Sequence, residues 1–177
     1  MCAVPFLTRR ATLSGSPDRG AEPPTGEPER LALHTIAEQF SPRYESHGVD
    51  LVSIDVSGLG RLLGPPQTIG EELRREAAAR GVRAHVAVAG TRMAALVLAI
   101  ARPGLSVVAG GAEAEALASI TIGILEKIPD DGDSKSFAAF AGFAFQKWGL
   151  KTFGELAALP PADLAARLGR QALAWQA

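Results

Sequence analysis

The segment Val82–Gly104 decides the fold, and it reads VRAHVAVAGTRMAALVLAIARPG. Its first eight residues carry an apolar side chain at every second position, which predicts a strand over 82–89 with one buried face. Thr91 follows and has the side chain of a helix N-cap. The residues from there to Ala101 are apolar on almost every side, as in a helix that is buried nearly all round. The proline–glycine pair that closes the segment predicts a turn.

Outward from this segment, further patterns complete a layered structure. They predict a helix over 30–40, a strand over 50–57, a helix that begins with a Thr68–Glu71 capping box and ends at Gly81, and a strand over 105–108. The order strand, helix, strand, helix, strand predicts an α/β sandwich in which helices pack on a sheet. Alternation along the strand over 50–57 places Asp50 and Asp55 on opposite faces.

The two ends of the chain differ from its centre. Residues 1–29 are rich in proline and glycine, which predicts a disordered leader. The aromatic stripe from Phe137 to Trp148 is typical of a helical core, and Thr152 with Glu155 forms a second capping box in a helix-hairpin-helix-like unit. The predicted organisation is a leader over 1–29, an α/β domain over 30–120, a linker over 121–135 and a helical segment over 136–177.

Charge and composition narrow the function classes. The net charge of −1 gives no general attraction to nucleic acid. Residues 61–102, however, hold seven Arg and three Glu, an excess of +4 that indicates either a polyanion-facing surface or a solvated helix face. Cys2 is the single cysteine, and the three histidines show no metal-ligand spacing. The longest apolar run, Met93–Ala101, is too short to span a bilayer, so we expect a reducing, cytoplasmic setting.

Three stretches, in this order, resemble Y-family DNA polymerases of the UmuC/DinB type. Residues 40–64, which contain SPRYE and DLVSIDVSG, resemble the palm motif and are still more similar to the ImuB branch. Residues 81–108 are similar to the strand–helix segment that follows in the family. Residues 148–169, which begin WGLKTFGELAALP, resemble the thumb signature. The resemblance covers about residues 30–177 and implies a palm-like α/β sheet with packed helices and a truncated, helical thumb.

The resemblance also implies which positions would carry catalysis. The family holds two metal ions on an Asp of an N-terminal D-x-D-x-F-F strand and on an adjacent Asp–Glu pair. Asp50 matches the Asp of that pair, Leu51 stands at the Glu, and no D-x-D-x-F-F precedes them. Two Lys that the family places near the triphosphate correspond to Arg92 and Leu96. We therefore expect no catalytic residue, no metal beyond Asp50 as a residual candidate, and no cofactor, with Mg²⁺ only if activity is retained.

The function that the resemblance implies is that of an ImuB-like, non-catalytic accessory or scaffold in SOS-induced, mutagenic translesion synthesis. The implied partners are primer–template DNA, an error-prone replicative-type polymerase, a sliding clamp and a RecA-related helper. Candidates for phosphate contact are Arg92, Gly149, Lys151 and Thr152. The last three lie where a helix N-terminus can bind phosphate, whereas Arg92 has the alternative role of capping a surface.

Three other readings of the sequence remain open. The chain is a truncated remnant without autonomous function, a metal-dependent nucleotidyltransferase that uses Asp50 and Asp55, or an unrelated α/β interaction module. Three carboxylates within a few ångströms would support the nucleotidyltransferase. We also expect the first palm strand to be missing from the chain, which would leave a gap or an exposed edge in the sheet unless another chain supplies that strand.

Overall fold

The computed structural model describes residues 4–9, 27–48, 50–128, 145 and 147–168. The strands are β1 (Val4–Arg9), β2 (Tyr44–His47), β3 (Leu51–Ile54), β4 (Ala84–Ala89) and β5 (Leu105–Val107). The helices are α1 (Glu27–Phe40), α2 (Gly60–Leu63), α3 (Pro66–Ala79), α4 (Arg92–Ala101), α5 (Glu113–Ala118), α7 (Phe153–Ala157) and α8 (Pro161–Leu168), with a 3₁₀ helix η1 (Ile122–Lys127). None of the described helices is both long and apolar enough to cross a membrane.

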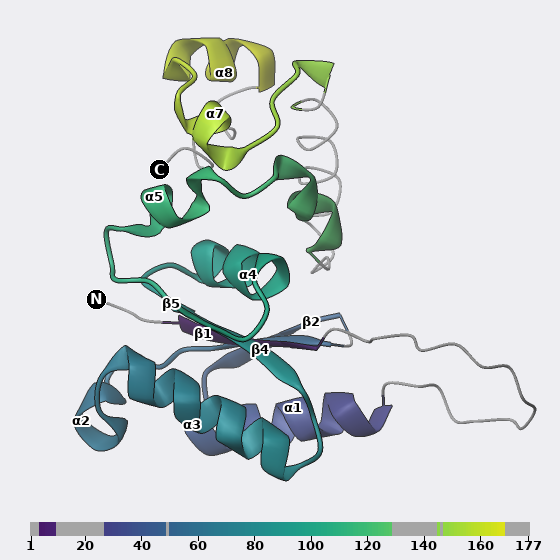
Figure 1. The fold of residues 1–177 in the computed structure, drawn as a ribbon, viewed down its shortest axis with the longest axis vertical. Coiled ribbons are helices and arrows are strands. Elements are labelled where there is room, and N and C mark those ends of the chain that lie inside the picture. The colour runs from purple at the N-terminus through teal and green to yellow at the C-terminus, as the bar shows by residue number, and fades with distance from the viewer. Residues whose placement is uncertain (1–3, 10–26, 49, 129–144, 146, 169–177) are drawn as a thin grey trace, which may run out of the picture.

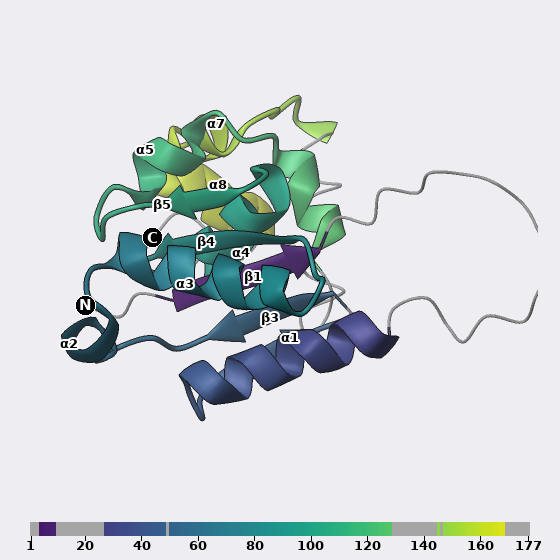
Figure 2. The ribbon, with the colours of Figure 1, turned by 60° about the horizontal axis from the view of Figure 1, so that its bottom comes forward.

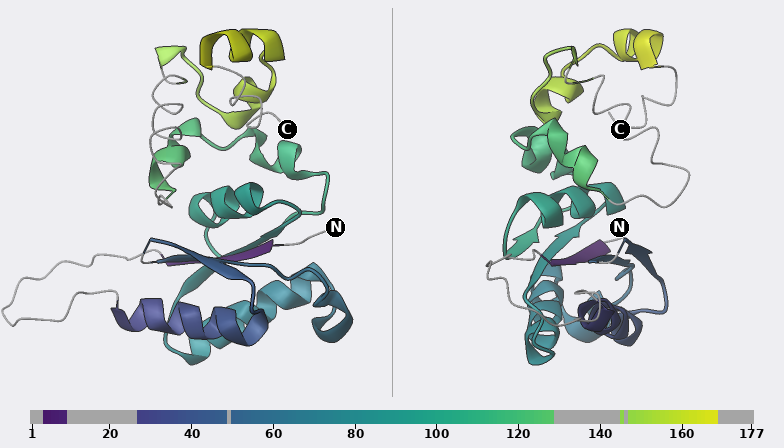
Figure 3. Two further views of the ribbon diagram at one scale, coloured as in Figure 1. Left: turned by 180° about the vertical axis from the view of Figure 1, so that it is seen from behind. Right: turned by 90° about the vertical axis from the view of Figure 1, so that its right-hand side faces the viewer.

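The predicted mixed α/β architecture is confirmed. The sheet is seen edge-on in Figure 1, with α1, α2 and α3 on one side and α4 on the other. Beyond α4 lie α5, α7 and α8, so that α4 separates the sheet from a small helical unit (Figure 3). The arrangement is a palm-like sheet with packed helices and an added helical segment, as the sequence predicts.

The first strand corrects the predicted leader. The sheet has the order β2-β3-β1-β4-β5, so β1 lies at its centre and runs antiparallel to both neighbours. The prediction of a disordered leader over residues 1–29 is therefore wrong for Val4–Arg9, and α1 already begins at Glu27. The expectation that the first palm strand is missing is wrong as well, since this chain supplies it. Residues 10–26 lie outside the described part.

Proline at position 5 is the reason why β1 escapes detection from sequence. Proline cannot donate a backbone hydrogen bond and is rare in central strands. β3 pairs only with residues 6–8 of β1, whereas β4 pairs with residues 4–9. Pro5 therefore lies beyond the end of β3 and has β4 as its single strand neighbour. A strand of six residues gains its stability from this pairing rather than from local propensity.

Each face of the sheet has its own apolar core. The face toward α1 and α3 buries the even-numbered side chains of β3 and β4, and these pack against Leu33, Ile36, Ile69 and Leu73. The opposite face buries Leu51, Ala87 and Ala89 against α4. The alternation predicted for residues 82–89 is thus confirmed, because Val86 and Val88 lie on one face and Ala87 and Ala89 on the other.

Helix α4 fits the prediction closely. Thr91 is its N-cap, and the Thr91 hydroxyl oxygen accepts a hydrogen bond from the backbone N–H of Ala94. The six residues from Ala94 to Ala99 are all buried. The sheet covers α4 from one side and Ile120 and Ile124 cover it from the other, which explains a helix with almost no polar face.

Two local predictions need correction. Helix α3 does not begin with the Thr68–Glu71 capping box: Pro65 is its N-cap, Pro66 is its first residue, and no side chain caps it. Proline suits the first helical position because the N–H that it lacks would have no partner within the helix there. Strand β2 is absent from the sequence prediction, since three of its four residues are polar or charged.

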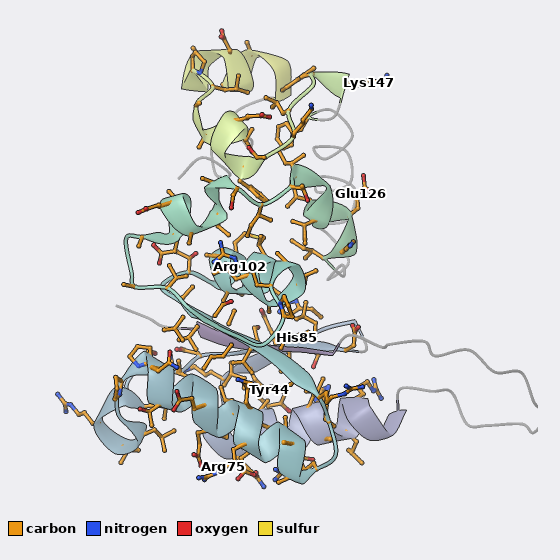
Figure 4. All side chains as sticks on the ribbon, viewed as in Figure 1. Tyr44, Arg75, His85, Arg102, Glu126 and Lys147 are labelled. Carbon is orange, nitrogen blue, oxygen red and sulfur yellow. The ribbon has the colours of Figure 1, made fainter. Side chains whose placement is uncertain are left out.

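The C-terminal helical unit has a small core of its own. It consists of Ile122, Leu125, Phe145 and Leu156. Residues 122–127 of the predicted linker thus form a 3₁₀ helix that packs into this unit, whereas 129–135 lie outside the described residues. Of the aromatic stripe, Phe145 is fully buried, and the other phenylalanines lie outside the described part. Arg102 joins the two parts: its Nη2 donates to the Ala116 carbonyl at 2.7 Å, and the side chain lies between α4 and α5 (Figure 4).

Candidate nucleic-acid interface

Asp50 and Leu51 lie at the turn between β2 and β3, and they have opposite environments. Asp50 is exposed. Leu51 is 1% exposed and belongs to the apolar cluster beneath α4. The position that the resemblance aligns with a catalytic Glu is thus a core position, where a charged carboxylate would lose its hydration.

The neighbouring strand brings no carboxylate to this turn. β1 pairs with β3 in the register Thr8↔Leu51, so Thr8 and Arg9 are the β1 residues nearest in register to Asp50. No three His, Cys, Asp or Glu side chains gather around one point in the described part of the chain. The two-metal site that the fold family implies needs several carboxylates around one point, and the described residues do not fit it.

Asp55 lies at the other end of β3 and has a structural role there. The β2–β3 ladder is regular from Tyr44↔Ile54 to His47↔Leu51, so no bulge brings Asp55 toward Asp50. The Asp55 carboxylate accepts the backbone N–H of Ser57 at 2.9 Å and lies 3.4 Å from Arg43 Nη1. The hydrogen bonds from Ser57, assisted by the Arg43 charge, hold the pKa of Asp55 below its ordinary value.

Arg92 takes part in a polar cluster that sequence reasoning missed. Its guanidinium forms an ion pair with Glu45 on β2, and both side chains are about half exposed. The buried His47 places Nε2 3.0 Å from the Ser53 hydroxyl and 4.0 Å from the Glu45 carboxylate. Alternation along β2 puts Glu45 and His47 on one face of the sheet. That signal is present in the sequence, but only once β2 itself is recognised.

The predicted phosphate site of the thumb lies in a turn whose backbone amides already donate hydrogen bonds to a side chain of the same turn. Gly149 has a φ of 76°, and Thr152 is the N-cap of α7 with the predicted capping box. The backbone N–H groups of Lys151 and Thr152 both donate to the Glu155 carboxylate. With those amides engaged, the Lys151 side chain, which is exposed, is the group of this turn that can reach a phosphate.

The candidates therefore lie on one side of the sheet but do not form one tight site. Arg92 begins α4, and Lys151 precedes α7 in the helical unit beyond it; Figures 1 and 3 show both helices on the same side of the sheet. Separate cations on a broad surface are typical of contacts to a nucleic-acid backbone, which present charge without reading sequence.

Comparison with known proteins supports the polymerase resemblance. Residues 27–99 match the model of the impB/mucB/samB family. A DNA polymerase IV of Dehalococcoides mccartyi (strain CBDB1) is 31% identical over 140 residues, which are 77% of this chain and 34% of the relative. Protein ImuB of Caulobacter vibrioides is 29% identical over 148 residues, 82% of this chain and 30% of the relative. The chain spans about a third of the length of these curated relatives.

Solved structures agree on the fold. A DinB family error-prone DNA polymerase from Sulfolobus solfataricus superposes with a TM-score of 0.64 at 12% identity, over 99% of this chain and 65% of that structure. A Dbh ternary complex gives the same TM-score at 13% identity, over 98% of this chain and 65% of that structure. The predicted resemblance to Y-family polymerases, of both DinB and ImuB type, is confirmed by these matches.

The comparisons overturn one prediction. The sequence led us to expect that the chain is not an enzyme, because Leu51 replaces a family carboxylate. One curated relative and the matched solved structures, however, are named as DNA polymerases, and these are enzymes. Leu51 at the position of a family carboxylate and the separation of Asp50 from Asp55 do not by themselves show that the chain is inactive.

Proposed function

We propose, on the premise that residues 27–99 match the impB/mucB/samB family, that this chain binds primer–template DNA in damage-induced translesion synthesis. The observation that carries the proposal is the palm-like sheet with a helical unit packed beyond α4, an arrangement shared with solved error-prone polymerases. Because the proposed ligand is DNA, we place this chain in the cytoplasm.

The proposed partners follow the ImuB-like side of the resemblance. As an accessory, the chain holds primer–template DNA for an error-prone replicative-type polymerase in the SOS response. A sliding clamp and a RecA-related helper complete the set. The match to Protein ImuB over 82% of this chain supports this choice of partners over those of an unrelated α/β module.

The charges of the described residues predict weak DNA binding. Arg92 and Lys151 are the proposed phosphate contacts on the α4 side of the sheet. Binding to duplex DNA weakens with salt by a logarithmic slope of about 0.9 per phosphate contact, so two contacts predict a slope of about −2. Glu45 competes with phosphate for Arg92, and the net charge of −1 adds no general attraction.

Fluorescence anisotropy with a labelled primer–template tests the proposal. Lys151→Ala is expected to weaken binding about threefold to tenfold and to reduce the salt slope by about one unit. Glu45→Gln is expected to strengthen binding about twofold to threefold, since it leaves the Arg92 guanidinium without its carboxylate partner. Arg74→Ala is the matched control: Arg74 is exposed on α3, across the sheet from both contacts, and its removal leaves affinity unchanged.

Two outcomes would sink the proposal. The first is a folded sample, judged by circular dichroism, that shows no salt-dependent binding at low ionic strength. The second is a loss of DNA affinity in Arg74→Ala as large as that in Lys151→Ala. That result would mean that DNA is attracted by charge in general and not by the proposed surface.

A second candidate function is template-directed nucleotidyl transfer, which the relatives named DNA polymerase IV favour. Primer extension with Mg²⁺ measures it directly. Incorporation that Asp50→Asn abolishes supports this candidate, because Asp50 is the family carboxylate that the chain retains. Incorporation that persists in Asp50→Asn indicates a contaminating polymerase, and no incorporation by a DNA-binding sample removes the candidate.

A further inference from the structure

A cavity of about 380 Å³ lies at the edge of the sheet opposite to Asp50. Strands β3 and β4 are both antiparallel to β1, and β5 is parallel to β4, so β3, β4 and β5 run in one direction. Their carboxyl ends meet at this edge, next to α2 (Figure 2). In open α/β sheets, the space beyond the carboxyl ends of strands is a preferred place for ligands.

The cavity has an apolar floor, and five of its thirteen lining residues are glycine. Val56, Ile69 and Ala89 line it and are each at most 3% exposed. Gly58 and Gly64 also line it, with φ values of 91° and 89° that disfavour any other residue. Most of the other lining residues are small or apolar, so the cavity offers a mostly apolar space in which a flat ring can lie.

One cation stands at the cavity. Arg61 is the single charged side chain among the described residues that line it. It is exposed, and no hydrogen bond or ion pair joins it to another described residue. Two arginines of α3 and its C-terminal end, by contrast, have carboxylate partners: Arg75 pairs with Glu72 and Arg80 with Glu76. A ligand with a negative group would therefore meet a guanidinium that has no competing carboxylate.

A carboxylate outside the lining lies against Gly90, which is a lining residue. The Glu113 carboxylate accepts the N–H of Gly90 at 2.9 Å and that of Gly111 at 2.6 Å. Gly90 lines the cavity, and a Cβ at this position would lie 2.3 Å from Glu113 Oε1, so the carboxylate closely covers the glycine. Because Glu113 lies against Gly90 and Arg61 lines the cavity, we expect the anionic group of a ligand to lie toward Arg61.

We propose that this cavity binds a small, flat aromatic ring that carries one anionic group, with the ring beside the lining glycines and the anion on Arg61. Two sources offer that chemistry: an aromatic acid and a nucleoside monophosphate. The proposal is independent of DNA binding, since Arg92 and Lys151 do not line the cavity.

A fluorescence titration with 1-anilinonaphthalene-8-sulfonate, an aromatic anion, tests the site on the full chain. One saturable site is expected. Gly60→Leu is expected to abolish it, because Gly60 lines the cavity and a leucine side chain there would take up ligand space; a Cβ at Gly60 meets no atom within 4 Å, so the fold itself is not strained. Arg61→Gln is expected to weaken binding about threefold to tenfold. Arg74→Gln, an exposed arginine on the same helix layer, is expected to change nothing.

The source of the ligand is decided by displacement. Deoxyadenosine monophosphate that displaces the probe from the saturable site assigns the site to nucleotides, and failure to displace it assigns the site to aromatic acids. The proposal is overturned if Gly60→Leu, shown by circular dichroism to be folded, binds the probe as the parent chain does. It is equally overturned if no saturable site is found, or if Arg74→Gln weakens binding as much as Arg61→Gln.

Discussion

The two ends of β3 lead to opposite edges of one sheet, and the edges are built differently. At the Asp50 edge, formed by Thr8, Asp50 and Leu51, the side chain of Leu51 is packed into the core. At the glycine edge, formed by the loops around Gly58 and Gly64, the chain leaves a cavity of about 380 Å³. At the Asp50 edge, a packed core residue stands where the family resemblance predicts a carboxylate. At the glycine edge, the chain has an open cavity that no sequence motif indicates.

The largest expected effect is that of restoring the family carboxylate. Leu51→Glu would place a charge in the apolar cluster beneath α4, where it finds no hydration, and is expected to lower the free energy of unfolding by about 3–5 kcal/mol. Urea denaturation followed by circular dichroism measures this. Asp50→Glu, one residue earlier and exposed, is the control, with a change within about 0.5 kcal/mol. A cost for Leu51→Glu as small as the control's would mean that the Asp50 edge is open to solvent.

A smaller effect is expected at the glycine edge. Gly64→Ala forces a residue with a Cβ to adopt a φ of 89° and is expected to destabilise the fold by about 1–2 kcal/mol. The nearest atom to the new Cβ would be 3.7 Å away on Thr68, so the cost is one of backbone conformation rather than of a clash. Gly60→Ala, at the first residue of α2, has no such φ and is expected to cost nothing. Equal melting temperatures for the two variants would contradict this account of the loop.

The smallest effect is expected at Asp55, which lies at the start of the loop that leads to Gly58. Asp55→Asn is expected to cost about 0.5–1.5 kcal/mol at pH 7, because it weakens the hydrogen bonds from Ser57 and removes the charge that attracts Arg43. The pKa of the carboxyl is lowered in the folded state, so its stabilisation is complete above its ordinary value of about 4 and is lost as pH falls below that value. The stability difference between parent and variant should therefore be smaller at pH 3 than at pH 7. A difference as large at pH 3 as at pH 7 would assign it to another cause.

Local patterns explain how much of the fold could be predicted. The unit β4–α4–β5 was predicted well because alternation, the Thr91 cap and the apolar helix are all local signals. β1 was missed because a short strand with Pro5 is specified by its pairing with β3 and β4. Pairing partners distant in sequence leave no mark on the six residues themselves.

The candidate site was less predictable, for the same physical reason. Arg92 was identified as a candidate, but its partner Glu45 lies 47 residues away, on a strand that the sequence analysis did not find. The capping box of Thr152 was predicted and is confirmed. That cap also engages the amides proposed to bind phosphate. The cavity is lined by the segments that follow β3, β4 and β5, which only the fold brings together.

Hydrogen–deuterium exchange with and without primer–template DNA tests the central claim, that DNA binds on the α4 side of the sheet, most directly. The account predicts slower amide exchange on DNA binding around residues 91–95 and 147–153, with no change along α3. Protection confined to α3, or bound DNA without protection in either of the first two segments, would contradict it.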